Sequence, residues 1–108
     1  MYTQVATQLV VTTTAAVFSQ AVSMEGANAV QVSLTAFNLN SATITVQLQE
    51  SNDLQNWADV SGASFTVSSA YYGTNKTTGI ASAYVRLKYT IATGGPAVLS
   101  AGINTALL

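Results

Sequence analysis

The chain has 108 residues, the size of one small domain, and contains neither cysteine nor histidine. These absences exclude disulfides, thiolate catalysis and cysteine- or histidine-based metal sites, and they remove the most common general base of enzymes. Only 6% of the residues are charged, against about a quarter in ordinary soluble domains, whereas 49% are hydrophobic. A formal net charge of −1 does little to keep copies apart, so we expect much of the surface to meet neighbouring subunits. The alternative is a surface of Thr, Ser, Asn and Gln that simply hydrogen-bonds to water.

Nucleic acid and membranes are not expected partners of this chain. Its three basic residues, Lys76, Arg86 and Lys88, are too few to neutralise a nucleic-acid backbone. No apolar run approaches the roughly 18 to 20 residues that a membrane-spanning helix needs. The N-terminal sequence also lacks the basic start and long apolar block of a secretory signal, so we expect synthesis in a cytoplasm.

Apolar residues recur mainly at every second position and many are β-branched, which predicts strands with one buried face. The first two candidates are the weaker strands 7–13 and 16–22, which the threonine run 12–14 separates. Residues 1–13 could form a core strand or an extended arm that pairs with a neighbouring subunit. The apolar residues 103–108 pose the same question, because they too need something to cover them.

Two strong alternating segments follow, at residues 29–37 and 42–51. Between them Asn38, Asn40 and Ser41 suit a turn, so we predict that the two segments form an antiparallel hairpin. A short strand is predicted at 64–68. The Ser-, Gly- and Thr-rich stretch at 71–79 instead predicts a long loop, in which the adjacent Tyr71 and Tyr72 suit a contact surface.

The clearest strand lies at 83–91, where alternation places Arg86 and Lys88 on the solvent or partner face. A Thr-Gly-Gly-Pro turn at 93–96 leads to a last strand at 97–104. In total, seven or eight short strands predict an all-β fold, an antiparallel β-sandwich or jelly roll, formed by one domain over residues 1–108.

Carboxylates are the remaining candidates for chemistry. Glu50 and Asp53 flank a turn and Asp59 follows it, which would allow an acid/base pair or a calcium site. Their spacing matches no calcium loop, and Ser51, Asn52 and Asp53 are explained more simply as turn residues that hydrogen-bond to the local backbone. We therefore expect no enzyme activity, no metal site and no cofactor.

Trp57 is the single tryptophan and follows this turn. Single tryptophans in small β domains usually pack in the core, so we expect Trp57 to cap one end of the sandwich. The alternative is an exposed platform on which Trp57, Tyr71 and Tyr72 stack against a sugar.

The segment VQLQESNDLQNWADV, together with SAYVRLKYTI and GGPAVLSAGIN further on, resembles small structural proteins of tailed bacteriophages and prophages. In those sequences a strand leads into Ser-Asn-Asp, a tryptophan follows, and a strand of the type Tyr-Val-Arg-Leu-x-Tyr lies near the C-terminus. The matching residues here are Ser51, Asn52, Asp53, Trp57, Tyr84, Val85, Arg86, Leu87 and Tyr89. The resemblance covers residues 46–104, and a similar strand, polar turn and tryptophan also occur in carbohydrate-binding and discoidin-like β-sandwiches.

The phage resemblance implies a virion component present in many copies, such as a capsid decoration, minor head or tail-associated protein. Together with the low charge, it predicts a non-enzymatic virion protein that self-assembles and binds phage capsid or tail proteins. The candidate partner or glycan contacts are Trp57, Tyr71, Tyr72, Arg86 and Lys88. A carbohydrate-binding β-sandwich module with an aromatic platform is the alternative function.

Overall fold

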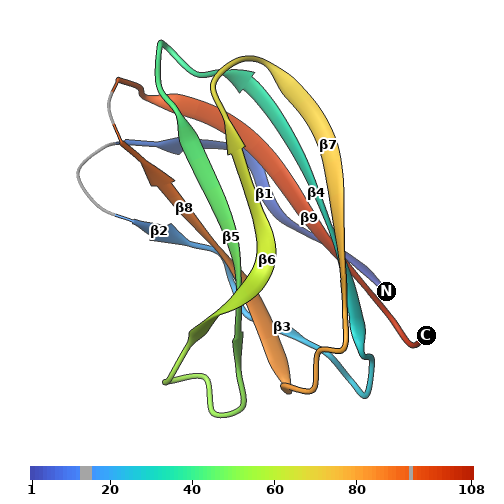
Figure 1. Ribbon diagram of the computed structural model, residues 1–108. Helices are drawn as coiled ribbons and strands as arrows, with labels where there is room; N and C mark the ends of the chain where they lie inside the picture. The colour runs from blue at the N-terminus through green and yellow to red at the C-terminus, as the bar shows by residue number, and fades with distance from the viewer. Residues whose placement is uncertain (13–15, 93) are drawn as a thin grey trace.

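The protein folds into two antiparallel β-sheets packed face to face, as the computed structural model in Figure 1 shows. The structure describes residues 1–12, 16–92 and 94–108. Within these residues there are nine strands, and the predicted all-β sandwich is confirmed. No helix in the described residues is long and apolar enough to cross a membrane.

Each sheet contains strands that are distant in sequence. Sheet A consists, in spatial order, of β1 (Tyr2–Val11), β9 (Ala97–Ala106), β4 (Ala29–Asn38) and β7 (Tyr71–Thr78). Sheet B consists of β2 (Val17–Phe18), β8 (Tyr84–Ile91), β5 (Ile44–Ser51) and β6 (Ala58–Val67), and β3 (Val22–Ser23) also pairs with β8.

The pairing pattern is that of a jelly roll. If β2 and β3 are counted as one interrupted strand, the first strand pairs with the last, the second with the second-last, and so on inward to β5 and β6. A long antiparallel ribbon paired in this way and rolled up gives the two four-stranded sheets seen here. Both chain ends lie together at one end of the sandwich (Figure 1), where the Thr105 N–H donates to the Met1 carbonyl over 2.8 Å.

Strict alternation along β8 shows how the sequence specifies the core. Val85, Leu87 and Tyr89 point between the sheets and are fully buried, whereas Arg86 and Lys88 lie on the outer face of sheet B, as predicted. The facing positions of sheet A, on β4 and β9, are also buried aliphatic side chains. Each such side chain contributes roughly 1.5–3 kcal/mol when fully buried, and together they hold the two sheets in contact.

The predicted hairpin between residues 29–37 and 42–51 is wrong. β4 pairs with β7 and β9 in sheet A, whereas β5 pairs with β6 and β8 in sheet B. The connecting residues contain Leu39 and Ala42, both buried, and the Ala42 N–H donates to the Leu39 carbonyl over 2.8 Å. These apolar side chains close one end of the core, so the chain crosses from one sheet to the other instead of folding back on β4.

The predicted loop at 71–79 is also wrong, because residues 71–78 form the edge strand β7. All eight residues pair with β4, from Ala36 opposite Tyr71 to Ala29 opposite Thr78. None of them is buried, so the strand lacks the alternation of apolar residues that marks a half-buried strand. Its polar composition fits an exposed sheet edge rather than a loop.

Several predicted strands are present with different limits. β1 begins at Tyr2 and pairs with β9 of the same chain, β9 continues to Ala106, and β6 covers ten residues instead of five. The weak candidate at 16–22 forms the two short strands β2 and β3. Residues 13 and 14 of the threonine run, and residue 93 of the predicted turn, lie outside the described residues. Positive φ angles at Gly94 and Gly95 are consistent with the rest of that turn.

A bulge in β6 explains why this strand is hard to recognise from its sequence. The pairing with β5 shifts between Gln47 and Gln49, and Gly62 in the bulge has a φ of 76°. The Gln47 side-chain amide donates to the Val60 carbonyl over 2.9 Å and to the Leu48 carbonyl over 2.8 Å. Gln47 thus replaces ladder hydrogen bonds that the bulge interrupts.

Candidate functional site

The outer face of sheet B holds an arginine between two aromatic rings. The guanidinium carbon of Arg86 lies 4.0 Å from the centroid of the Phe18 ring and 4.2 Å from that of the Trp57 ring. Both distances are well within the range of cation–π attraction. We call these three residues the arginine stack.

Three separate segments build the arginine stack. Arg86 is on β8 in the middle of sheet B, Phe18 is on β2 beside it, and Trp57 immediately precedes β6 on the other side. Lys88 is directly opposite Phe18 in the ladder and therefore lies on the same face. The structure thus brings together three of the predicted contact residues, Trp57, Arg86 and Lys88.

A network of hydrogen-bonded polar side chains holds the Arg86 guanidinium in place. Arg86 Nε donates to Gln49 Oε1 over 2.9 Å, and Gln49 Nε2 donates to Asp59 Oδ1, also over 2.9 Å. Gln49 is buried, so both of its hydrogen bonds are shielded from water. Partial burial lowers the pKa of Arg86, although an arginine remains charged at any physiological pH.

The Arg86 guanidinium can still donate hydrogen bonds to another molecule. Among the described residues the guanidinium makes one hydrogen bond, from Nε to Gln49, and its two terminal NH₂ groups have no hydrogen-bond partner. A guanidinium whose planar fork is free suits a carboxylate or a backbone carbonyl of another molecule. The rings restrict its motion in advance, so little conformational entropy is lost when a partner binds.

The turn before Trp57 positions the indole ring. Asp53 Oδ1 accepts hydrogen bonds from the backbone N–H groups of Gln55 and Asn56 over 2.9 and 2.8 Å, and the Ser51 hydroxyl accepts from the Asp53 and Leu54 N–H groups. The hydrogen bonds from Asn56 are the main cause that holds the pKa of Asp53 far below its usual value. The predicted turn chemistry is therefore confirmed.

The expected core position of Trp57 is wrong. Its side chain is half-buried on the outer face of sheet B and covers Arg86, and it does not belong to the cluster of buried side chains. Sequence could not show this, because Trp57 lies outside the alternating segments. Phe18 was missed altogether: its short strand β2 has too few residues for a recognisable pattern.

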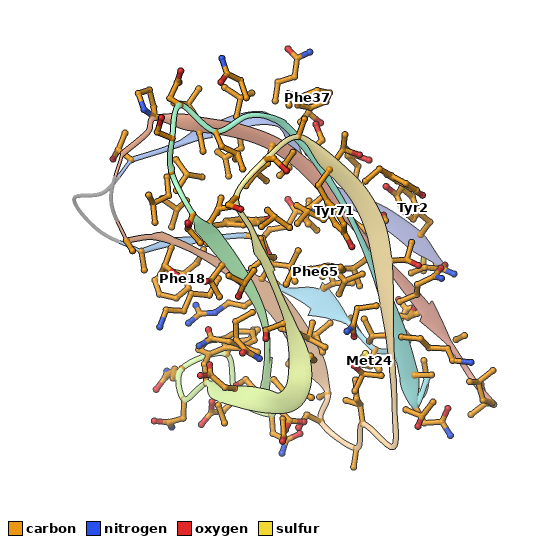
Figure 2. All side chains as sticks on the ribbon, turned by 45° about the horizontal axis from the view of Figure 1, so that its top comes forward. Tyr2, Phe18, Met24, Phe37, Phe65 and Tyr71 are labelled. Atoms are coloured by element: carbon orange, nitrogen blue, oxygen red, sulfur yellow. The ribbon has the colours of Figure 1, made fainter. Side chains whose placement is uncertain are left out.

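The tyrosines lie on the other sheet, so the alternative arrangement, a platform of Trp57, Tyr71 and Tyr72, is not formed either. Tyr71 faces inward at the edge of β7, where its ring meets Phe65 edge-on with centroids 6.1 Å apart. Tyr72 points outward from sheet A and is 68% exposed. Figure 2 shows Phe18 and Tyr2, which belong to the two outer faces, on opposite sides of the sandwich.

Glu50 and Asp53 line one hollow of about 290 Å³, but both carboxylates are bonded to neutral groups. Glu50 accepts a hydrogen bond from the Ser82 hydroxyl over 2.8 Å, Asp53 caps its turn, and Asp59 bonds Gln49. Within the described residues, no group of three acidic side chains is arranged to hold a metal ion.

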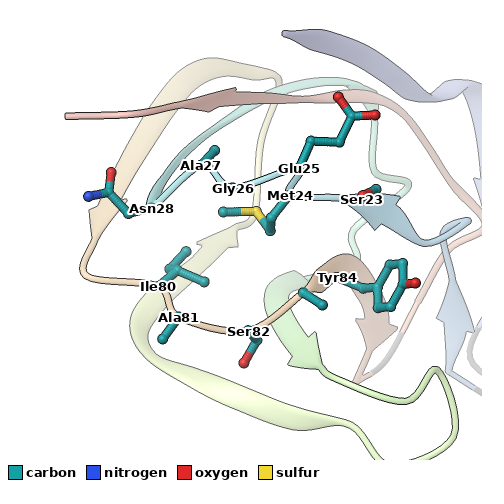
Figure 3. A pocket seen from close by; sticks show the side chains of 11 residues that line it. Ser23, Met24, Glu25, Gly26, Ala27, Asn28, Ile80, Ala81, Ser82 and Tyr84 are labelled. Carbon is teal, nitrogen blue, oxygen red and sulfur yellow. The ribbon is translucent and has the colours of Figure 1, made fainter.

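A hollow of about 520 Å³ lies between the residues 23–28 and 80–84 at one end of the sandwich. In Figure 3 the side chains of Met24 and Ile80 point toward one another inside it, whereas the Glu25 carboxylate points away from the Ser82 hydroxyl. Within the hollow Glu25 is therefore not paired with Ser82, whose hydroxyl instead donates to Glu50.

These features define a small jelly-roll domain with a polar outer face that carries a preorganised arginine. No family model and no curated protein matches the chain. Among solved structures, the PBSX exported protein XepA shares the fold, with a TM-score of 0.75 and 12% sequence identity. The alignment covers all of this chain but 37% of XepA, so the chain spans well under half of that protein's length. At this identity the likeness concerns the fold alone.

Proposed function

We propose that this chain is a non-enzymatic structural module of a phage-related particle, and that the arginine stack binds a neighbouring protein subunit. The neighbour is another copy of the chain or a capsid or tail protein. The observation that carries the proposal is the Arg86 guanidinium, held between Phe18 and Trp57 with its terminal NH₂ groups unused by the described residues.

The composition of this face favours a protein partner. Arginine and tryptophan are the residue types most enriched at the energetic centres of protein interfaces, where neighbouring side chains exclude water. Lys88 adds a second cation beside Phe18, whereas the nearby Asp59 is already bonded to Gln49. We therefore expect the partner to present a carboxylate or a carbonyl to Arg86.

The fold and its structural neighbour support the same class of function. Jelly rolls occur in viral capsid proteins, although a fold alone does not specify a function. The neighbour XepA is phage-related and exported. The sequence resemblance to small phage structural proteins includes Trp57 and Arg86, two members of the arginine stack.

Exposed apolar side chains at the ends of the chain also favour assembly. Met1, Leu107 and Leu108 are largely exposed, and Met1 and Leu107 line the same hollow. In a protein with so few charges, such apolar ends are typical of a surface that a neighbouring subunit covers.

Size-exclusion chromatography with light scattering, combined with co-sedimentation on purified particles, tests the proposal. We expect a mass above the 11.2 kDa of one chain, or binding to the particle, and a loss of that association in Arg86→Ala. Lys76→Ala is the matched control, because it removes a cation from sheet A and should leave association unchanged. A wild-type monomer that binds no particle would overturn the proposal.

A further inference from the structure

A second surface with ligand-binding character lies on the outer face of sheet A, on the side of the molecule opposite the arginine stack. A groove of about 230 Å³ runs across this sheet. Tyr2 and Tyr72 lie along it, and its floor includes Ser33, Thr35 and Gly102. We call it the tyrosine groove.

Gly102 allows the hydroxyl end of Tyr2 to lie close to the sheet. Gly102 is opposite Gln4 in the ladder between β1 and β9, and a Cβ atom at position 102 would overlap the Tyr2 ring. The Tyr2 hydroxyl donates to Gln4 Oε1 over 2.7 Å, and Gln4 Nε2 donates to the Ala6 carbonyl, also over 2.7 Å. The hydroxyl end of the ring is thus held close to the backbone of Gly102, while 54% of the residue remains exposed.

The rest of the groove provides a second aromatic ring and free hydroxyl groups. Tyr72, on β7, is directly opposite Thr35 of β4, and 68% of it is exposed. The hydroxyls of Ser33 and Thr35 have no hydrogen-bond partner among the described residues. Each can both donate and accept a hydrogen bond, so the floor can bind a ligand rich in hydroxyl groups.

Charge is absent from the lining of the tyrosine groove. Within the four strands of sheet A the single charged residue is Lys76, and it does not line the groove. The groove therefore gives no electrostatic advantage to an anionic or cationic ligand. A neutral ligand with apolar ring faces and peripheral hydroxyl groups complements its two rings and its hydroxyl floor.

We infer that the tyrosine groove binds a neutral oligosaccharide, with sugar rings stacked on Tyr2 and Tyr72 and sugar hydroxyls bonded to Ser33 and Thr35. The inference is independent of the proposed role of the arginine stack, because the two surfaces belong to different sheets. It also assigns the sugar site to residues other than the predicted platform, with Tyr72 as the one residue in common.

Titration of the isotope-labelled protein followed by NMR tests this site. The probes are cellohexaose, the hexamer of N-acetylglucosamine, maltohexaose and, as a charged analogue, hexagalacturonate. We expect at least one neutral probe to shift the amide signals of residues around the groove and to leave those around Arg86 unchanged. Tyr2→Ala and Tyr72→Ala should each weaken this binding about fivefold to tenfold, the effect of losing one stacked aromatic ring.

Two further variants separate stacking from a general effect on folding. Gly102→Ala should displace the Tyr2 ring and weaken binding without removing any ligand contact of its own. Phe37→Ala removes a half-exposed aromatic side chain of β4 that does not line the groove, and should leave binding within twofold of wild type.

Three results would overturn the inference. The first is no shift with any neutral probe up to millimolar concentration. The second is tighter binding of hexagalacturonate than of every neutral probe. The third is a shift of the groove signals with protein concentration alone, abolished by Tyr72→Ala, which would show that a second copy of the chain occupies the groove.

Discussion

The arginine stack makes a quantitative prediction about stability. Arg86→Met keeps a long, flexible side chain but removes the positive charge, the planar group and the hydrogen bond to Gln49. Two cation–π contacts at a half-exposed site contribute about 0.5–1 kcal/mol each, and the hydrogen bond to Gln49 about 1 kcal/mol. We therefore expect Arg86→Met to lower the free energy of unfolding by about 2–3 kcal/mol.

A double-mutant cycle isolates the contact between Arg86 and Trp57. The free energy of unfolding is measured by urea denaturation and circular dichroism for wild type, Arg86→Met, Trp57→Leu and the double variant. The distance of 4.2 Å between the guanidinium carbon and the ring centroid predicts a coupling energy of about 0.5–1 kcal/mol.

The control cycle pairs Arg86→Met with Phe37→Ala on the opposite sheet. These two changes should be additive within about 0.3–0.5 kcal/mol, because the residues share no partner. If the Arg86–Trp57 coupling is no larger than that of the control cycle, the two side chains do not attract each other, and the preorganisation of Arg86 is refuted.

Three other substitutions test individual features of the fold. Tyr89 is fully buried and its hydroxyl has no hydrogen-bond partner among the described residues. Tyr89→Phe should therefore raise the free energy of unfolding, measured by urea denaturation, by about 1–2 kcal/mol. The control Tyr84→Phe should change it by less than about 0.5 kcal/mol. Burial also raises the pKa of Tyr89, so wild type should lose stability above pH 10.0 and Tyr89→Phe should lose less; a destabilised variant would show that the hydroxyl is bonded. Gln47→Leu removes the amide that bonds the Val60 carbonyl in the β6 bulge and should cost about 1–3 kcal/mol; an unchanged urea midpoint would mean that water replaces it. Asp53→Asn should lower the melting temperature at pH 7, because the ionised Asp53 carboxylate, whose pKa is depressed in the fold, stabilises the protein above pH 3.8. This contribution is lost as the pH falls below 3.8. A difference from wild type that stays constant down to about pH 2 would contradict this reasoning.

The sequence predicts those parts of the fold in which alternation is set by burial on one face. β8 was predicted closely because Val85, Leu87 and Tyr89 must face the core while Arg86 and Lys88 cannot. Alternation does not specify which strands pair, so the crossover from β4 to β5 was mistaken for a hairpin. The edge strand β7 was mistaken for a loop, since its stability depends on backbone pairing with β4 and not on buried side chains.

The candidate site was predicted in part for the same reason. Arg86 and Lys88 were recognised because a cation on a half-buried strand must lie on its outer face. Phe18 was not recognised, because a strand of two residues, β2, is too short to show alternation. The position of Trp57 over Arg86 depends on the turn that Asp53 caps, and a turn of this kind fixes local backbone geometry without indicating which sheet face the next side chain will cover.

The tyrosine groove depends on contacts between residues far apart in sequence. Tyr2 and Gly102 meet because the first and last strands are neighbours in a jelly roll. Tyr72 reaches the same groove because β7 is at the other edge of the same sheet. Neither contact leaves a local signal in the sequence.

The most direct test of the proposed structural role is the protein composition of phage or phage-like particles purified from cells that carry the gene for this chain. Quantitative mass spectrometry should find the chain in many copies per particle, and cross-linking should join residues around Arg86 to a neighbouring subunit. Particles that lack the chain, together with a free monomer in the culture, would contradict the account.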